Sequence, residues 1–92
     1  EWEKEIGDIF TRNGEYEEAE SHYTVALEQI KQLGEEKLEQ DILSSFGDLY
    51  SKKNEAQKAI KLFKQALSIS KSKEESKILK EKIKVLEMNI ES

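Results

Sequence analysis

The side chains that could take part in acid–base or metal chemistry are 20 acidic residues and one histidine. The carboxylates stand at the spacing of solvated helix faces, whereas a catalytic acid needs burial or a close partner to shift its pKa. His22 has no second histidine and no cysteine to complete a metal site. The four glycines lie too far apart in the sequence to form a phosphate-binding loop. The sequence therefore predicts no enzyme, no metal site and no cofactor.

The composition indicates one charge-rich domain with a small core. The chain has 92 residues, of which 38% are charged and 36% hydrophobic, and it contains no proline and no cysteine. The absence of cysteine excludes disulfides and fits a cytoplasmic location best. No apolar run approaches the roughly 18–20 residues that a membrane span requires, so we expect no membrane partner. The chain begins without methionine and with helix-like sequence, so we expect it to be a fragment of something longer.

Charge is distributed unevenly along the chain. Residues 1–36 hold 11 acidic and 3 basic residues, a net charge of −8, whereas residues 51–92 hold 11 lysines and 6 glutamates, a net charge of +5. The basic part has glutamates mixed through it and one aromatic residue, Phe63, which argues against nucleic-acid binding. Solvated helix faces of opposite sign explain this pattern. The sharper alternative is that the charges favour head-to-tail stacking of similar units.

A pentapeptide at positions 6–10 recurs at positions 46–50, and each copy reads large apolar, glycine, aspartate, aliphatic, aromatic. The same offset also relates positions downstream of each copy, which are Ala19 and Ala59, Tyr23 and Phe63, and Ala26-Leu27 and Ala66-Leu67. An offset that holds without a gap over so many positions indicates a duplicated structural unit.

Apolar residues recur with the period of a helix, and no segment alternates as a strand would. The pattern predicts five helices, over residues 1–13, 15–33, 35 or 36–53, 55–71 and 72–90. Gly14 and Gly34 are expected to end the first two helices. Asn54 is the expected N-cap of the fourth helix, with Gln57 as its capping-box partner, and Ser72 to Glu75 read as a capping box for the fifth.

Each helix is expected to bury one apolar stripe. The predicted stripes are Trp2, Ile6, Ile9 and Phe10; Tyr16, Ala19, Tyr23, Ala26, Leu27, Ile30 and Leu33; Leu38, Ile42, Leu43, Phe46, Leu49 and Tyr50; Ala59, Ile60, Phe63, Ala66, Leu67 and Ile69; and Ile78, Leu79, Ile83, Leu86 and Ile90. Gly7 and Gly47 have no side chain, so a neighbouring helix can approach closely, with aromatic residues filling the remaining space. The sequence thus predicts two tight antiparallel helical hairpins.

This pattern resembles the tetratricopeptide repeat, whose signature is Trp-x2-Leu-Gly-x2-Tyr, then Ala-x3-Phe, then Pro. The second unit reads Leu43-x2-Phe46-Gly47-x2-Tyr50 and then Ala59-x3-Phe63, and the first reads Ile6-Gly7-x2-Phe10 and then Ala19-x3-Tyr23. Glu3 and Leu43 stand at the tryptophan position, and Lys31 and Lys71 stand near that of the closing proline. The unit is also longer than usual, about 40 residues where the family has about 34. This length resembles the long-repeat branch of the family, found in scaffolds and peptide-sensing regulators.

The resemblance implies an all-α fold, a right-handed α-solenoid of stacked antiparallel hairpins. The first repeat would cover residues 1–34, and the second would cover residues 36–71. The fifth helix, within residues 72–92, does not continue the pattern, because Glu87 stands where a third glycine equivalent to Gly7 and Gly47 would fall. We expect it to cap the last apolar face, as terminal units of repeat arrays do. The alternative is the first helix of a degenerate third repeat.

The resemblance also implies that the first helix of each pair lines a concave face. With about 100° per residue, the polar residues within about 60° of Asp8 or of Asp48 lie on the side opposite the core. The candidate groove residues are Lys4, Asp8, Thr11, Arg12, Asp41, Ser44, Ser45, Asp48, Ser51 and Lys52. The alternative is that two repeats form too short a groove and these residues are merely solvated.

The family subgroup that grips the C-terminal carboxylates of chaperones uses lysine and asparagine at these places. Here Asp8 and Asp48 stand where asparagine would, and only Lys4 resembles a clamp lysine. The resemblance therefore disfavours an acidic tail and favours a polar or basic peptide. We expect a protein-interaction module that binds a peptide or helix, cut from a scaffold or adaptor. The alternatives are a regulatory, peptide-sensing domain of a signalling protein and a structural repeat that self-associates through its ends.

Overall fold

The computed structural model describes residues 2–91 and, for side chains, residues 2–90. Five helices follow one another, namely α1 (Glu3–Arg12), α2 (Tyr16–Leu33), α3 (Glu36–Lys52), α4 (Ala56–Ile69) and α5 (Lys73–Glu91). No strand forms within residues 2–91, so the all-helical prediction is confirmed. Each helix begins and ends within about two residues of its predicted bounds. The first residue, Glu1, where the first helix was expected to begin, lies outside the described part.

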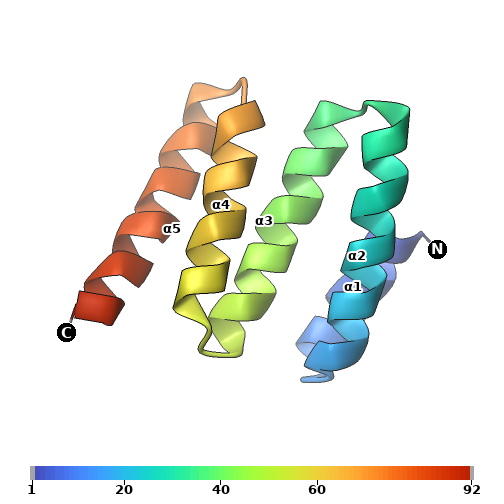
Figure 1. Cartoon of the computed structure of the whole chain (residues 1–92), viewed down its shortest axis with the longest axis horizontal. Coiled ribbons are helices and arrows are strands. Elements are labelled where there is room, and N and C mark those ends of the chain that lie inside the picture. The colour runs from blue at the N-terminus through green and yellow to red at the C-terminus, as the bar shows by residue number, and fades with distance from the viewer. Residues whose placement is uncertain (1, 92) are drawn as a thin grey trace.

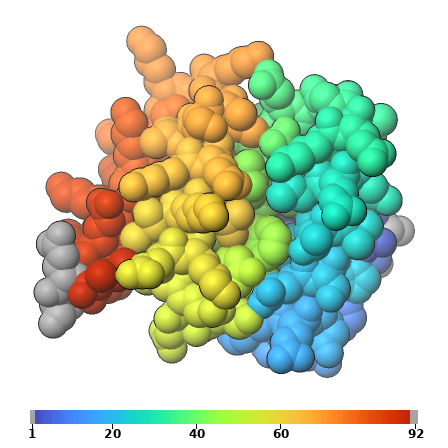
Figure 2. Space-filling model, viewed as in Figure 1, coloured from blue at the N-terminus to red at the C-terminus, as the bar shows by residue number. Residues whose placement is uncertain are grey.

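The helices pair as antiparallel hairpins in chain order. α1 packs on α2, α3 packs on α4, and α5 packs on α4, while α2 and α3 join the two hairpins. α1 lies behind α2 in Figure 1, and α3 stands between α2 and α4. α2 and α4 cover much of the near face in the space-filling view, with α3 visible between them (Figure 2). The stack measures 38 × 31 × 17 Å, as expected of a short α-solenoid.

The glycines of the repeated pentapeptide allow the hairpins to close. A β-carbon placed on Gly7 would lie 2.7 Å from the ring of Tyr23, and one placed on Gly47 would lie 2.6 Å from the ring of Phe63. Both rings are almost fully buried. The predicted close approach is therefore confirmed, and the group that comes close is an aromatic ring of the following helix.

Two turns at equivalent positions of the repeat close by the same geometry. Gly14 has φ +81° and Asn54 has φ +63°. After each, the next N–H donates to a carbonyl five residues back, Glu15 to Phe10 and Glu55 to Tyr50, both at 2.9 Å. This is the long hydrogen bond of a Schellman closure. The prediction that Asn54 is an N-cap is wrong, because its left-handed backbone ends α3 and no side-chain cap forms at the start of α4.

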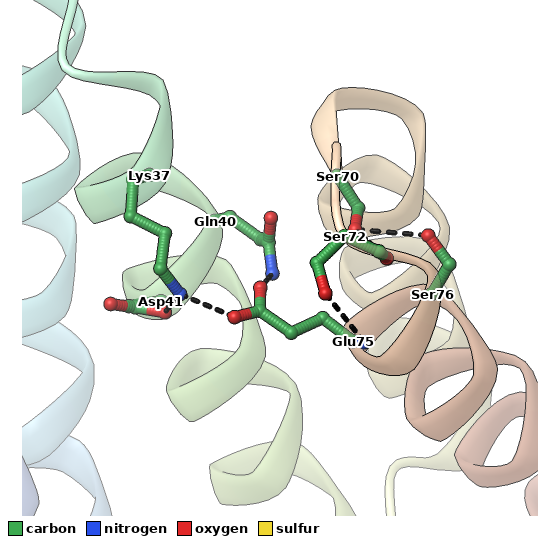
Figure 3. A network of polar contacts seen from close by, with 7 residues as sticks. All are labelled: Lys37, Gln40, Asp41, Ser70, Ser72, Glu75 and Ser76. Atoms are coloured by element: carbon green, nitrogen blue, oxygen red, sulfur yellow. Dashed lines mark hydrogen bonds and ion pairs between the residues drawn. The ribbon is translucent and has the colours of Figure 1, made fainter.

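The capping box predicted for the fifth helix forms only in half. The N–H of Glu75 donates to the Ser72 hydroxyl at 3.4 Å. The Glu75 side chain does not return to Ser72; it reaches α3, where it accepts a hydrogen bond from Lys37 at 2.6 Å and another from Gln40 (Figure 3). The carboxylate thus ties α5 to α3 instead of closing the box.

Four residues assigned to buried stripes are exposed, namely Leu33, Leu38, Ile78 and Ile90. Leu33 is 71% exposed in the last turn of α2. Leu38 lies in the first turn of α3, and Ile90 in the last turn of α5. Ile78 faces a cavity between α3 and α5.

Candidate functional site

The first helices of the two hairpins enclose a shallow polar cavity of about 300 Å³. Its lining residues are Asp8, Thr11, Arg12, Tyr23, Ser45, Asp48 and Lys52. All except Tyr23 belong to the groove set proposed from the sequence. The helical spacing on α1 and α3 brings these polar side chains to one side, and α2 contributes the tyrosine.

Asp8 is held by two donors within the chain. The Tyr23 hydroxyl donates to one carboxylate oxygen at 2.5 Å, and the ammonium of Lys4 lies 2.9 Å from the other. Burial, and then the hydrogen bond to Asp8, raise the pKa of the Tyr23 phenol well above its ordinary value. The helical wheel placed Asp8 away from the core and missed this pairing. The signal was present in Gly7, whose missing side chain lets the ring of Tyr23 reach the next residue of α1.

Thr11 lines the cavity but is largely buried. Its hydroxyl donates to the carbonyl of Gly7 at 2.9 Å and lies 3.3 Å from the Tyr23 oxygen. It therefore supports the tyrosine and presents little surface to a partner.

A second cavity, of about 500 Å³, lies next to the first between α3, α4 and α5. Its lining residues are Asp48, Ser51, Phe63, Ile78, Glu81, Lys82, Val85 and Leu86. Four of these stand one repeat length after residues of the first cavity: Asp48 after Asp8, Ser51 after Thr11, Phe63 after Tyr23 and Val85 after Ser45. The two cavities are thus copies of one feature of the repeat, and Asp48 borders both.

The second copy is more apolar than the first. Phe63 takes the place of Tyr23 and brings no hydroxyl, and Val85 takes the place of Ser45. Asp48 instead meets the ammonium of Lys82, whose Nζ lies 3.1 Å from one carboxylate oxygen and 3.4 Å from the other. The same ammonium lies 5.4 Å from the centre of the Phe63 ring, within cation–π range.

The remaining groove candidates divide into paired and unpaired side chains. Asp41 accepts a hydrogen bond from Lys37 at 3.2 Å and borders neither cavity. Ser44 is partly exposed on α3 and also borders neither cavity. Arg12 and Lys52 are exposed at the rim of the first cavity. Neither of these two cations forms an ion pair with another described residue.

A third hollow, of about 540 Å³, lies between the α2–α3 turn and the α4–α5 connection. Glu75 lines this hollow and accepts hydrogen bonds from Lys37 and Gln40 of α3 (Figure 3). The hydrogen bond from Lys37 lowers the pKa of Glu75. Lys71 and Glu36 also line it, and the Nζ of Lys71 lies 3.1 Å from a carboxylate oxygen of Glu36. Sequence reasoning missed this junction, because its partners lie far apart in the chain.

His22 has a structural setting. Its ring stacks on Phe10, with centroids 5.3 Å apart, and its Nδ1 contacts the carboxylate of Glu3. No group of three potential metal ligands occurs in the part of the chain that the structure describes. None of the described helices is both long enough and apolar enough to cross a membrane.

Comparison with known proteins supports the repeat pattern. A family model described as tetratricopeptide repeat matches residues 2–72, which is both hairpins up to the residue before α5. Neither the curated proteins nor the solved structures that were compared with the chain gave a significant match.

Proposed function

This chain belongs to the tetratricopeptide repeat family, and from that premise we propose that it binds a peptide or helix of a partner protein in the groove formed by α1, α3 and α5. The observation that carries the proposal is the pair of cavities related by the repeat and joined at Asp48. A peptide lying across the helices would meet the same feature twice, first polar and then apolar. Recognition by a groove of helices is a recurring mode of peptide binding.

The acids of the groove favour a polar or basic peptide. Asp8 and Asp48 stand one repeat apart, and each holds a lysine of the chain itself, Lys4 or Lys82. A basic side chain of a partner can replace Lys82 at Asp48, because this ion pair is exposed and exposed ion pairs contribute little stability. Arg12 and Lys52 at the rim are hydrogen-bond donors only, which suits the carbonyls of a bound peptide.

Filling the first cavity tests the proposal. Peptides are selected on the wild-type protein from a phage-displayed library of random short peptides, and their affinity is measured by fluorescence anisotropy. Ser45→Trp places an indole in the cavity, while Ser68→Trp places the same group on the exposed side of α4. We expect Ser45→Trp to abolish binding and Ser68→Trp to retain it. Equal binding by both variants, or no selected peptide, would contradict the proposal.

A second candidate function is self-association, because the two ends of the stack differ in charge. α2 exposes Glu17, Glu18 and Glu28, whereas α5 exposes Lys77, Lys80 and Lys84. A contact between the acidic end of one copy and the basic end of another is head-to-tail, so further copies can add in the same way. We also propose that the two repeats cover residues 1–34 and 36–71, that residues 72–92 cap the array, and that the protein is cytoplasmic.

A further inference from the structure

The two cavities differ in how their aspartate is neutralised, and the difference concerns the chemistry of the partner. In the first cavity a phenol and a lysine both donate to Asp8. In the second the ring that covers Gly47 is Phe63, which has no hydroxyl. Lys82 is therefore the donor to Asp48 among the described residues, and its ammonium sits between the carboxylate and the aromatic ring.

We propose that the second cavity recognises a lysine or arginine of the bound peptide at Asp48, together with an aliphatic side chain next to it in the peptide. Lys82 occupies the cation position in the free protein and leaves it when the partner binds. This inference rests on the proposed peptide-binding function and names the class of peptide.

The position of Lys82 shows what the site accepts. A carboxylate and an aromatic face together favour a cation. Asp48 has 48% of its side chain exposed, so a partner can reach it, and Lys82 is 37% exposed on a flexible stem that can turn into solvent. An arginine of the partner can bind the two oxygens of Asp48 through two separate N–H groups, whereas Lys82 reaches both from a single ammonium, at 3.1 and 3.4 Å.

The wall beside this cation position is apolar. Ile78 and Val85 of α5 are 53% and 57% exposed, and both line the cavity with Leu86 and Phe63. The lining contains two acidic residues, Asp48 and Glu81, and one basic residue, Lys82. The cavity therefore becomes more acidic once the Lys82 side chain turns into solvent. Apolar surface beside an acidic rim complements a basic residue with an aliphatic neighbour.

The test uses the peptides selected on the wild-type protein and three variants with unchanged helical circular dichroism. Asp48→Asn removes the anion, and Lys82→Met removes the competing ammonium but keeps an aliphatic stem. Glu28→Gln removes one negative charge from the exposed side of α2 and is the charge-matched control. We expect the selected peptides to be enriched in lysine or arginine adjacent to leucine, isoleucine, valine or methionine.

For the best selected peptide, Asp48→Asn should weaken binding about tenfold or more, because a charge-assisted hydrogen bond is lost. Lys82→Met should strengthen binding about threefold, because the peptide no longer has to displace a surface ion pair of that strength. Glu28→Gln should bind like wild type. Acidic or purely apolar peptides that Ser45→Trp still blocks would overturn this inference and leave the proposed function standing. The absence of any selected peptide would overturn both.

Discussion

The contact between Gly47 and Phe63 predicts the effect of Gly47→Ala on stability. Whether this change lowers or raises the free energy of unfolding depends on how closely the Phe63 ring covers the glycine. Gly47→Ala should improve the helix propensity of α3 by about 1 kcal/mol, since glycine is that much poorer than alanine inside a helix. The new methyl group, however, would lie 2.6 to 2.9 Å from three carbons of the Phe63 ring. The ring is 1% exposed, so it cannot withdraw into solvent.

Overpacking of this kind costs roughly 1–3 kcal/mol. Taking about 2 kcal/mol as the steric cost and about 1 kcal/mol as the gain in propensity, the free energy of unfolding should fall by about 1 kcal/mol. In a Phe63→Leu background the ring is gone, and the same Gly47→Ala change should raise stability by about 1 kcal/mol. The coupling between the two sites is then about 2 kcal/mol, within the range for residues in contact.

Urea unfolding followed by circular dichroism measures all four proteins of this cycle. A chain of 92 residues has a total stability of roughly 5–14 kcal/mol, so each difference is resolvable. The pair Gly7 and Tyr23 should behave alike, because the corresponding contact is 2.7 Å. A gain in stability from Gly47→Ala in the wild-type background would refute the reasoning, since it would mean that no ring covers this glycine.

Three further predictions concern the turn, the junction at α5 and the charged ends. Asn54→Ala should cost about 1 kcal/mol in urea unfolding, because its φ is +63°, whereas Asn13→Ala, at φ −84°, should be nearly neutral. Lys37 lowers the pKa of Glu75, so the stability from this bond should be complete above the ordinary glutamate pKa of about 4.3 and be lost as the pH falls through the lowered value. Glu75→Gln should flatten the pH dependence of stability in acid unfolding. An unchanged pH profile in this variant would count against the bond between Lys37 and Glu75. If unlike ends stack, size-exclusion chromatography should show a shift toward monomer at 1 M salt, where screening acts over about 3 Å, and a monomer at every salt concentration would exclude stacking.

The repeated small and aromatic residues made much of the fold predictable. Gly7 and Gly47 leave room for the rings of Tyr23 and Phe63. The spacing between each glycine and its ring therefore determines how each hairpin closes. The turn at Asn54 was misjudged because asparagine serves both as an N-cap and as a left-handed residue. Only its place in the second repeat, equivalent to that of Gly14 in the first, distinguishes the two roles.

The candidate site was less predictable, because periodicity gives the direction of a side chain but not its partner. The wheel placed Asp8 and Asp48 on the groove side, and both border the first cavity. It could not show that Tyr23 reaches Asp8 past a glycine, or that Lys82 of α5 takes the equivalent place at Asp48. Such contacts join residues of different helices, so they depend on how the helices cross.

The groove itself is tested most directly by a nuclear magnetic resonance titration of the isotope-labelled protein with a peptide selected on the wild type. Binding in the groove predicts that the largest amide shifts fall on α1, α3 and α5, around Thr11, Ser45, Asp48 and Val85. The exposed sides of α2 and α4 should remain unchanged. Shifts confined to α2 and α4, with the amides of both cavities unmoved, would contradict the account.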